Sequence, residues 1–293
     1  MKNKWKVYLP FLENQFKKNL AYKGSFYLFI ISSLFKPFIS YYLWMAIYGS
    51  SPTGVLGGLT QAEMVVYVFM TYITSDLALI GISGEISDGV MEGSVVMTLL
   101  KPIDYRLSLI SKAFGEMMYR FIAPVAFVWI GLEIYKVTVL GLGFTPIANI
   151  VLFLFSLIMS FFIYVLFDFC FGMVAFVTTY MFGMNMAKNA LLGFLSGQLI
   201  PISFFPEVLQ TAFTFLPFSS MVYTPVMVYL GKYTGAELLF VLGRQFFWIL
   251  FLYALGSYLW SRITKRLIVL GGYADEDIKT IRTFVPGICS TVF

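Results

Sequence analysis

The sequence predicts an all-α integral membrane protein with six transmembrane helices, and its composition is the first reason. Apolar residues make up 59% of the 293 residues and charged residues only 12%. A soluble domain carries about twice that charged fraction, so lipid must solvate most of this chain. The apolar residues also gather into six stretches, each near the ~20 residues that a helix needs to cross a bilayer. These stretches are 25–48, 62–82, 114–135, 147–172, 185–203 and 243–263.

We expect a single membrane domain over residues 1–272 and a tail over 273–293. Residues 1–23 are predicted to form an amphipathic helix, because apolar side chains recur there every three or four positions while lysines lie mainly on other faces. This pattern is typical of a helix lying in the membrane interface. A basic flank of the first span is the alternative. The apolar residues are Trp5, Leu9, Leu12, Phe16 and Leu20.

The positive charges predict that both ends of the membrane domain are cytoplasmic. With six spans, 15 lysines and arginines fall in inner connections or at inner span ends, and only Lys136, Lys232 and Arg244 fall outside. Lys and Arg favour the cytoplasmic side of a membrane. We therefore expect a multi-pass protein of the cell membrane with an even number of spans.

The inner connection over residues 83–113 carries a short polar island, Gly-Glu-Ile-Ser-Asp-Gly at 84–89, in an otherwise membrane-like chain. A conspicuous cytoplasmic polar helix in a membrane protein without an enzyme motif typically contacts a soluble partner. The candidate contact residues are Glu85, Asp88, Gly89 and Glu92.

The outer connection over residues 204–242 is apolar and punctuated by prolines. Such a sequence predicts short helices that dip back into the outer leaflet, where other parts of the protein must cover their backbone polar groups. A plain hydrophobic loop is the alternative. The residues expected to shape this re-entrant segment and its approach are Pro201, Pro206, Pro217, Phe218 and Pro225.

Five ionisable residues fall well inside the predicted spans, where an unpaired charge is costly. Glu116 and Arg120 are four residues apart with the acid first, the spacing of an ion pair on one helix face. Asp76 and Asp168 lie in the inner halves of their spans, where they either line a polar path or cap neighbouring helices. Lys36 precedes Pro37, which predicts a kink, and Lys36 either reaches the interface or pairs with Asp76 or Asp168.

The chain carries no recognisable catalytic or metal-binding motif. It has no histidine, and its two cysteines, Cys170 and Cys289, are far apart. It also lacks the G-x-x-x-x-G-K-[ST] loop that cradles nucleotide phosphates, the HExxH motif and the GxSxG motif. We expect a non-catalytic protein without a cofactor of its own. The basic residues follow the inner membrane boundary, where they interact with anionic lipid headgroups rather than with nucleic acid.

Two stretches carry a resemblance to a known family. The first contains Glu85-Ile86-Ser87-Asp88-Gly89, Leu99-Leu100-Lys101-Pro102, Tyr105-Arg106 and Gly115-Glu116. The second contains Gly197 to Pro201, Phe205-Pro206, Leu216-Pro217-Phe218, Pro225 and Gly231. Together with Leu259-Trp260 and Gly271-Gly272, they resemble the permease subunits of type-2 ABC exporters over residues 1–272, in particular the viologen-exporter-like branch. Two departures are Val177 after Phe176, where an aromatic pair is expected, and the tail beyond Gly272.

The resemblance implies a mechanism. Two permease chains, identical or homologous, would form the translocation path, and two copies of a separate ATPase would bind ATP and Mg²⁺ below them. Glu85, Asp88 and nearby residues would form the coupling helix that sits in a groove of the ATPase, braced by the N-terminal helix. The exported solute would be a hydrophobic or amphipathic drug, peptide or lipid-like molecule.

Two other functions are weighed against the exporter permease. An ion-coupled secondary transporter needs a buried carboxylate network, for which Asp76 and Asp168 are the candidates. A membrane-embedded assembly or immunity protein without transport would not explain the polar island or the proline-rich outer segment.

Overall fold

The computed structural model describes residues 4–21, 23–51, 54–99, 101, 103–178 and 180–272. It is 78% helical, which confirms the predicted all-α class. Pro102, Cys289 and the predicted tail 273–293 lie outside the described residues.

The first part of the chain forms a short helix, two longer ones and a β-hairpin. The 3₁₀ helix η1 (Lys4–Val7) leads into α1 (Leu9–Ala21), and α2 (Lys23–Gly49) continues through Pro37. The hairpin pairs β1 (Val55–Leu56) with β2 (Leu59–Thr60) and was not predicted. Gly57 and Gly58 both have positive φ angles, as the tight turn of such a hairpin requires.

The middle of the chain supplies the helices at the centre of the fold. α3 (Gln61–Ala78) begins with a capping box, in which Thr60 and Glu63 satisfy each other's free amides. After four non-helical residues come α4 (Ser83–Met91) and α5 (Ser94–Leu99). α6 (Tyr105–Arg120) and α7 (Ala126–Thr138) are joined by a π-helical turn, η2 (Phe121–Val125), where Pro124 lacks the amide that a regular helix uses.

The last part starts with α8 (Ile147–Gly172), which continues into the 3₁₀ helix η3 (Met173–Phe176). α9 (Phe182–Leu195) ends eight residues before the predicted fifth span does. The 3₁₀ helix η4 (Ile202–Phe204) follows, and residues 204–242, the predicted outer connection, contain the short helices α10 (Glu207–Phe215) and α11 (Tyr223–Tyr229). The long α12 (Gly235–Gly272) completes the fold.

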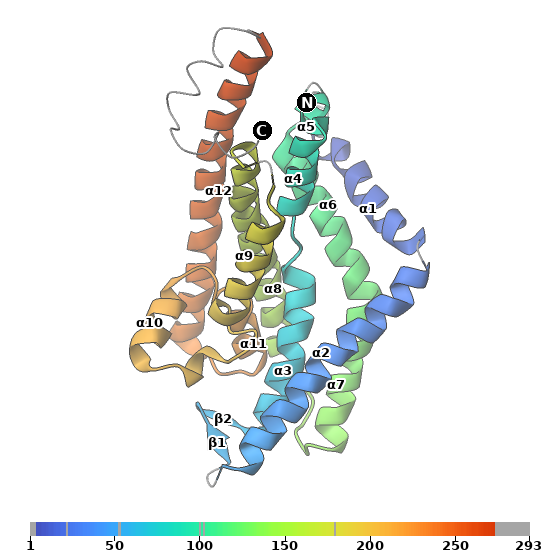
Figure 1. Cartoon of the computed structure of the whole chain (residues 1–293). Coiled ribbons are helices and arrows are strands. Elements are labelled where there is room, and N and C mark those ends of the chain that lie inside the picture. The colour runs from blue at the N-terminus through green and yellow to red at the C-terminus, as the bar shows by residue number, and fades with distance from the viewer. Residues whose placement is uncertain are drawn as a thin grey trace.

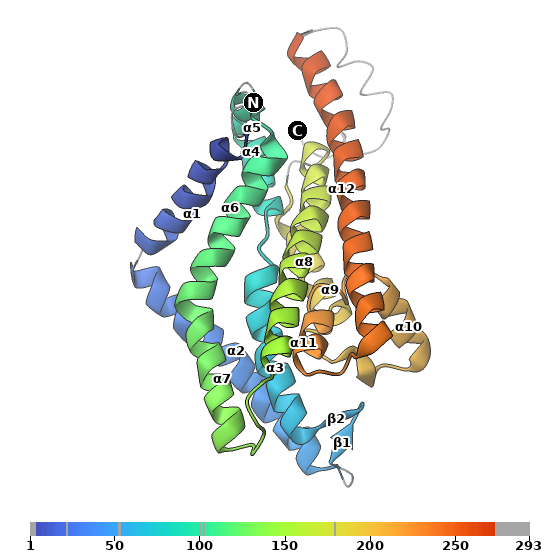
Figure 2. The same ribbon diagram turned by 180° about the vertical axis from the view of Figure 1, so that it is seen from behind.

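α3 and α8 form the core, and the other helices pack around them. α12 and α11 pack on α8, α2 packs on α3, and α1 packs on α6. Figures 1 and 2 show α4, α5, the start of α1 and the end of α12 at one end of the molecule. The hairpin and the C-terminal ends of α2 and α7 lie at the opposite end. The polar island and both ends of the described chain therefore lie at the same end of the molecule.

Among the described residues, three helical stretches are long and apolar enough to cross a membrane. They are Gln61–Met91, Ile147–Phe176 and Gly235–Thr264. They coincide with the second, fourth and sixth predicted spans. The count of six spans stays a prediction.

Candidate functional site

The polar island forms α4, a nine-residue helix with one exposed and one buried face. Glu85, Asp88 and Glu92 are exposed and are here called the α4 acidic face. Gly89 is buried instead, and a Cβ there would come within 2.9 Å of Val95 Cγ2. Of the four predicted contact residues, three therefore present carboxylates to the surroundings, and Gly89 lets α5 pack closely against α4.

An exposed ion pair connects the α4 acidic face to α6. Lys112 donates to Glu85, with side-chain exposures of 33% and 46%. An ion pair this exposed contributes only about 0 to 1 kcal/mol. Nearby, burial and then the charge of Glu85 raise the pKa of the Tyr105 phenol, which therefore stays neutral. Its ring stacks on Trp260 of α12 at a centroid distance of 5.2 Å.

The N-terminus of α4 is capped by a carboxylate from another helix. The N-cap residue Ile82 has no side chain that can accept a hydrogen bond from the helix, so the first amides of α4 need an acceptor from elsewhere. The backbone N–H groups of Ile82 and Ser83 donate to Asp168 Oδ2 of α8 at 2.6 and 2.7 Å. Asp168 has no solvent exposure, and its negative charge suits the positive end of the helix dipole.

Lys188 of α9 neutralises the buried carboxylate. Its ammonium group donates to Asp168 Oδ1, to Ser83 Oγ at 2.9 Å and to Asn185 Oδ1 at 3.1 Å. Ser83 Oγ in turn donates to Asn185 Oδ1 at 2.8 Å. All three ammonium protons thus have an acceptor, which offsets the desolvation of the two charges. Asp168, Lys188, Ser83 and Asn185 are here called the Asp168 anchor.

Glycine allows α8 to approach α4 this closely. A Cβ at Gly172 would lie 2.6 Å from Ile86 Cδ1 and 3.2 Å from Ser83 Cα. Ile86 is fully buried on the inner face of α4. Apolar contact therefore reinforces the polar anchor, and the first turn of α4 is fixed to the end of α8.

The three candidates for a polar path form no ion pair with one another among the described residues, although Lys36 lies close enough to Asp76 to interact electrostatically with it. Asp168 caps α4 and pairs with Lys188, which is one of the two roles left open for it. Lys36 is exposed and forms no ion pair with Asp76 or Asp168 among the described residues. Arg120 Nη1 donates to the Asp76 backbone carbonyl at 3.1 Å, and the charges of Arg120 and Lys36 also act on the Asp76 carboxylate.

The ion pair predicted from spacing forms on α6. Arg120 donates to Glu116, and both side chains are about a quarter exposed or less, at 21% and 26%. Gln15 of α1 reaches the same carboxylate at 3.4 Å. A Cβ at Gly115 would collide with the Leu12 carbonyl oxygen, so the backbones of α1 and α6 nearly touch. The N-terminal helix is thus packed on protein along α6.

The predicted re-entrant segment contains one buried helix and one exposed helix. Every residue of α11 is buried, including Pro225, whereas α10 buries none of its residues. Pro201 and Pro206 immediately precede η4 and α10, Pro217 is buried and Phe218 is half-buried. The protein therefore covers the backbone of α11, as a helix dipping into a bilayer requires.

Sequence reasoning missed a buried polar network that holds α12 against α8. Ser156 Oγ donates to Gln245 Oε1 at 2.9 Å, and Gln245 Nε2 donates to the Ser220 carbonyl at 2.8 Å and to Ser160 Oγ at 3.1 Å. Gln245 has no solvent exposure. A lone amide within the last apolar span was the available signal.

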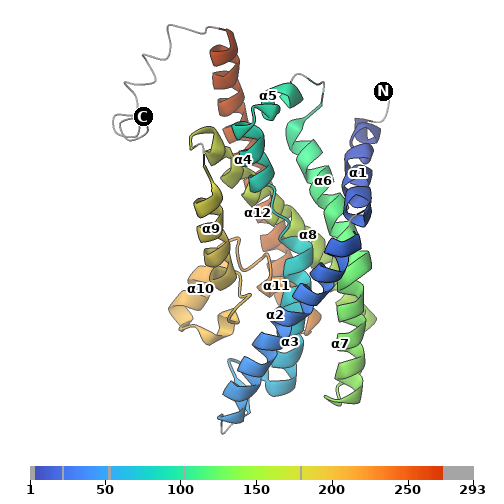
Figure 3. The ribbon, with the colours of Figure 1, turned by 45° about the vertical axis from the view of Figure 1, so that its right-hand side comes forward.

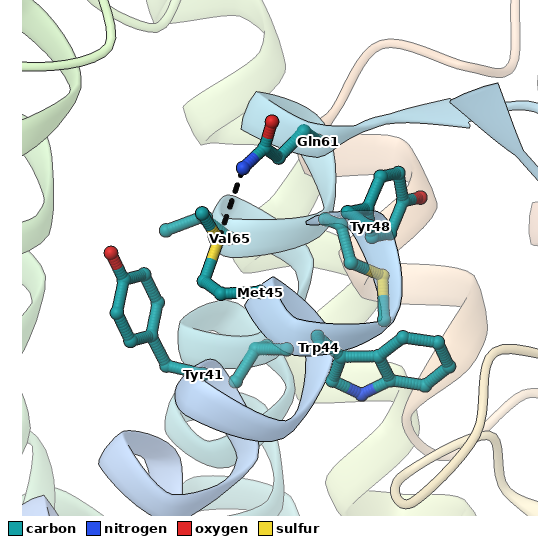
Figure 4. A pocket seen from close by; sticks show the side chains of 8 residues that line it. Tyr41, Trp44, Met45, Tyr48, Gln61 and Val65 are labelled. Atoms are coloured by element: carbon teal, nitrogen blue, oxygen red, sulfur yellow. Dashed lines mark hydrogen bonds between the residues drawn. The ribbon is translucent and has the colours of Figure 1, made fainter. Parts of the chain in front are cut away.

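Figure 4 shows a small pocket between α2 and α3 near the hairpin end of the molecule. Tyr41, Trp44 and Tyr48 line it, and Gln61 Nε2 contacts Met45 Sδ at 3.6 Å across it. The side chains around it leave no room for a small molecule. Within the described part of the chain, no group of three His, Cys, Asp or Glu residues could hold a metal ion.

The described residues thus form a helical membrane-protein fold in which the polar helix α4 is fixed at one end of the core. The family described as ABC-2 family transporter protein matches residues 34–271, well over half of the chain, and the chain belongs to that family. No curated protein and no solved structure matches the chain. The protein is thus a membrane permease of an ABC exporter, in a family whose members are typically non-catalytic and whose transport systems include an ATPase.

Proposed function

We propose that α4 is the coupling helix of this permease and that the α4 acidic face contacts a separate ATPase subunit. The observation that carries the proposal is that Glu85 and Asp88 on α4, and Glu92 directly after it, are exposed, while the opposite face of the helix is fixed to the core. A rigid element passes on a displacement, whereas a loop absorbs it. The ATPase would bind ATP and Mg²⁺ and drive export, and this chain would supply the membrane path.

The complete exporter would contain two permease chains, identical or homologous, and two ATPase copies. It would lie in the cell membrane with α4 and both chain ends in the cytoplasm, and residues 204–242 would re-enter the outer leaflet. The viologen-exporter-like branch and a hydrophobic or amphipathic solute follow from the motif resemblance and the aromatic content of 19%. Asp168 gives the ion-coupled alternative no support, because its carboxylate is occupied by Lys188 and the α4 amides, which leaves Asp76 as its remaining candidate.

The test is purification of the tagged chain from its native membrane in mild detergent, followed by identification of co-eluting proteins. We expect a nucleotide-binding subunit with the wild type and its loss from the variant Glu85→Gln/Asp88→Asn. The matched control is Glu207→Gln/Glu237→Gln, which removes two exposed carboxylates from α10 and α12 and should retain the subunit. A wild-type chain that elutes without any ATPase would contradict the proposal.

A further inference from the structure

The α4 acidic face can act on the membrane helices only through the connections that α4 makes. They include the chain continuity to α3, the Glu85–Lys112 pair with α6, and the Asp168 anchor with α8 and α9. They differ in stiffness, and the stiffest determines which helices move when α4 is pushed.

The connection to α3 is not helical, and it passes on a displacement less directly than a continuous helix would. Residues Leu79 to Ile82 are non-helical, so no continuous ladder of hydrogen bonds joins α3 to α4. Figure 3 shows this break as a thin, uncoiled ribbon between the two helices. The Glu85–Lys112 pair is also weak, because both side chains are substantially exposed.

The Asp168 anchor is the stiff connection. Asp168 and Lys188 expose 0% and 5% of their side chains, and together they hold two backbone amides and the Ser83 hydroxyl of α4. Breaking a buried pair leaves an uncompensated charge, so the pair resists separation far more strongly than an exposed one does. The close approach at Gly172 holds the same end of α4 against α8.

We infer that Asp168 and Lys188 are positioning residues of the transport cycle, which make α8 and α9, rather than α3, the helices that follow the displacement of α4. This inference rests on the proposed role of α4 as the coupling helix. It assigns a function to a buried ion pair between α8 and α9 whose members both bind α4. No sequence motif identifies this pair. Asn185 and Ser83 take part in the same coupling, because they supply the remaining hydrogen-bond acceptors of the Lys188 ammonium group.

The experiment follows the movement of α9 in the complete complex of permease and ATPase, reconstituted in lipid nanodiscs. Cys170 and Cys289 are replaced by Ala and Ser, and the exposed Met186 of α9 is replaced by Cys and labelled with bimane. The fluorescence change on adding ATP and vanadate reports the displacement of α9. Co-elution of the ATPase and thermal unfolding are measured on the same samples.

The key variant is Asp168→Asn/Lys188→Met. It removes both charges, and the side-chain amide that replaces the Asp168 carboxylate still offers an oxygen to the backbone amides of α4. We expect the double variant to fold and bind the ATPase, while its ATP-dependent fluorescence change falls about fivefold or more, the scale of an ordinary coupling energy. Lys188→Arg, which keeps the charge, should retain most of the change.

The matched control is Ser156→Ala/Gln245→Leu, which removes a buried polar contact between α8 and α12 away from α4. It should keep the wild-type fluorescence change. If the double variant does not fold, Ser83→Ala tests the same point, because it leaves the ion pair intact but removes its hydroxyl link to α4. A reduced change with Ser83→Ala supports the inference, and an unaltered change overturns it.

A full wild-type response in the Asp168→Asn/Lys188→Met complex would overturn the inference while leaving the proposed function intact, since the ATPase would still be bound. An equal loss in the Ser156→Ala/Gln245→Leu control would also overturn it, by showing that any buried contact on α8 has the same effect. A wild-type permease that binds no ATPase would contradict the proposed function itself, and the inference with it.

Discussion

At the scale of single residues, the buried Asp168–Lys188 pair is the most consequential arrangement in the chain. Each member alone would be a desolvated charge within an apolar protein. Together with the α4 amides and the Asn185 amide oxygen they form a network in which every ammonium proton has an acceptor. Removing one charge of such a network lowers the stability of the protein strongly, because the other charge is left buried and unpaired. Removing both charges lowers the stability much less.

The first prediction concerns this asymmetry. Asp168→Asn alone should lower the free energy of unfolding by about 3 to 5 kcal/mol, because Lys188 is left buried and unpaired. Asp168→Asn/Lys188→Met should recover most of that loss. Thermal unfolding in detergent, compared across the single and double variants, measures both. A double variant that is no more stable than Asp168→Asn would contradict this network.

The second prediction concerns the glycine under α4. Gly172→Ala places a Cβ within 2.6 Å of Ile86 and 3.2 Å of the Ser83 backbone, so α4 must shift. We expect a loss of stability of about 1 to 3 kcal/mol, typical of overpacking. The control is Gly131→Ala on α7, where nothing lies within 4 Å and the better helix propensity of Ala should leave stability unchanged or slightly higher. Equal thermal stability of the two variants would argue against tight packing at Gly172.

At this scale, the sequence predicts which residues pair within one helix, but not which residues pair between helices. The Glu116–Arg120 pair could be predicted, because residues four apart on one helix are necessarily neighbours. Lys188 and Asp168 lie on different helices, and their shared partners are backbone amides of a third helix, which no spacing rule identifies. Helix capping was one of two roles expected for Asp168, and the polar start of the fifth span, with Asn185 and Lys188, was a second hint, but neither identified the partners.

At the scale of elements, hydrophobic periodicity and proline placement predicted which helices form better than they predicted where each helix begins and ends. The N-terminal helix, the polar helix α4 and the short helices of the outer connection all form. The hairpin between α2 and α3 was missed, although Gly57-Gly58 between apolar residues is a typical turn signal. The end of α9 at Leu195 was also missed, because an apolar run alone does not indicate where a helix stops.

The third prediction belongs to the contact between α1 and α6. Gly115→Ala would drive a Cβ into the Leu12 carbonyl oxygen, so α1 must move away from α6. We expect limited trypsin digestion to cut faster at Lys17 and Lys18 on α1, since local opening exposes the backbone. The Gly131→Ala variant should be cut at the wild-type rate. Unchanged cleavage in Gly115→Ala would mean that α1 tolerates the added atom without loosening.

At the scale of the whole molecule, the fold places the polar helix, the start of α1 and the end of α12 together and the hairpin far away (Figure 1). The fourth prediction is that these two ends face opposite sides of the membrane. A membrane-impermeant maleimide should label Val55→Cys from outside intact cells and Asp88→Cys only after the membrane is permeabilised. Labelling of both from the same side would contradict the arrangement of spans.

Composition is enough to predict a membrane protein, and the local sequence pattern is enough to find the polar island. Short motifs are enough to show the resemblance to a family. The packing order of the helices and the anchoring of α4 on α8 and α9 could not, since they depend on contacts between residues far apart in the chain. The anchor joins positions 83, 168 and 188, and only the folded chain brings them together.

The contact between the α4 acidic face and an ATPase can be tested by site-specific photo-crosslinking in native membranes. A benzophenone amino acid is placed at Asp88 and, as the matched control, at Glu237 of α12, both of which are exposed. We predict an adduct between the permease and a nucleotide-binding subunit from position 88 and none from position 237. The absence of that adduct at position 88, or an equal yield from position 237, would contradict the coupling role of α4.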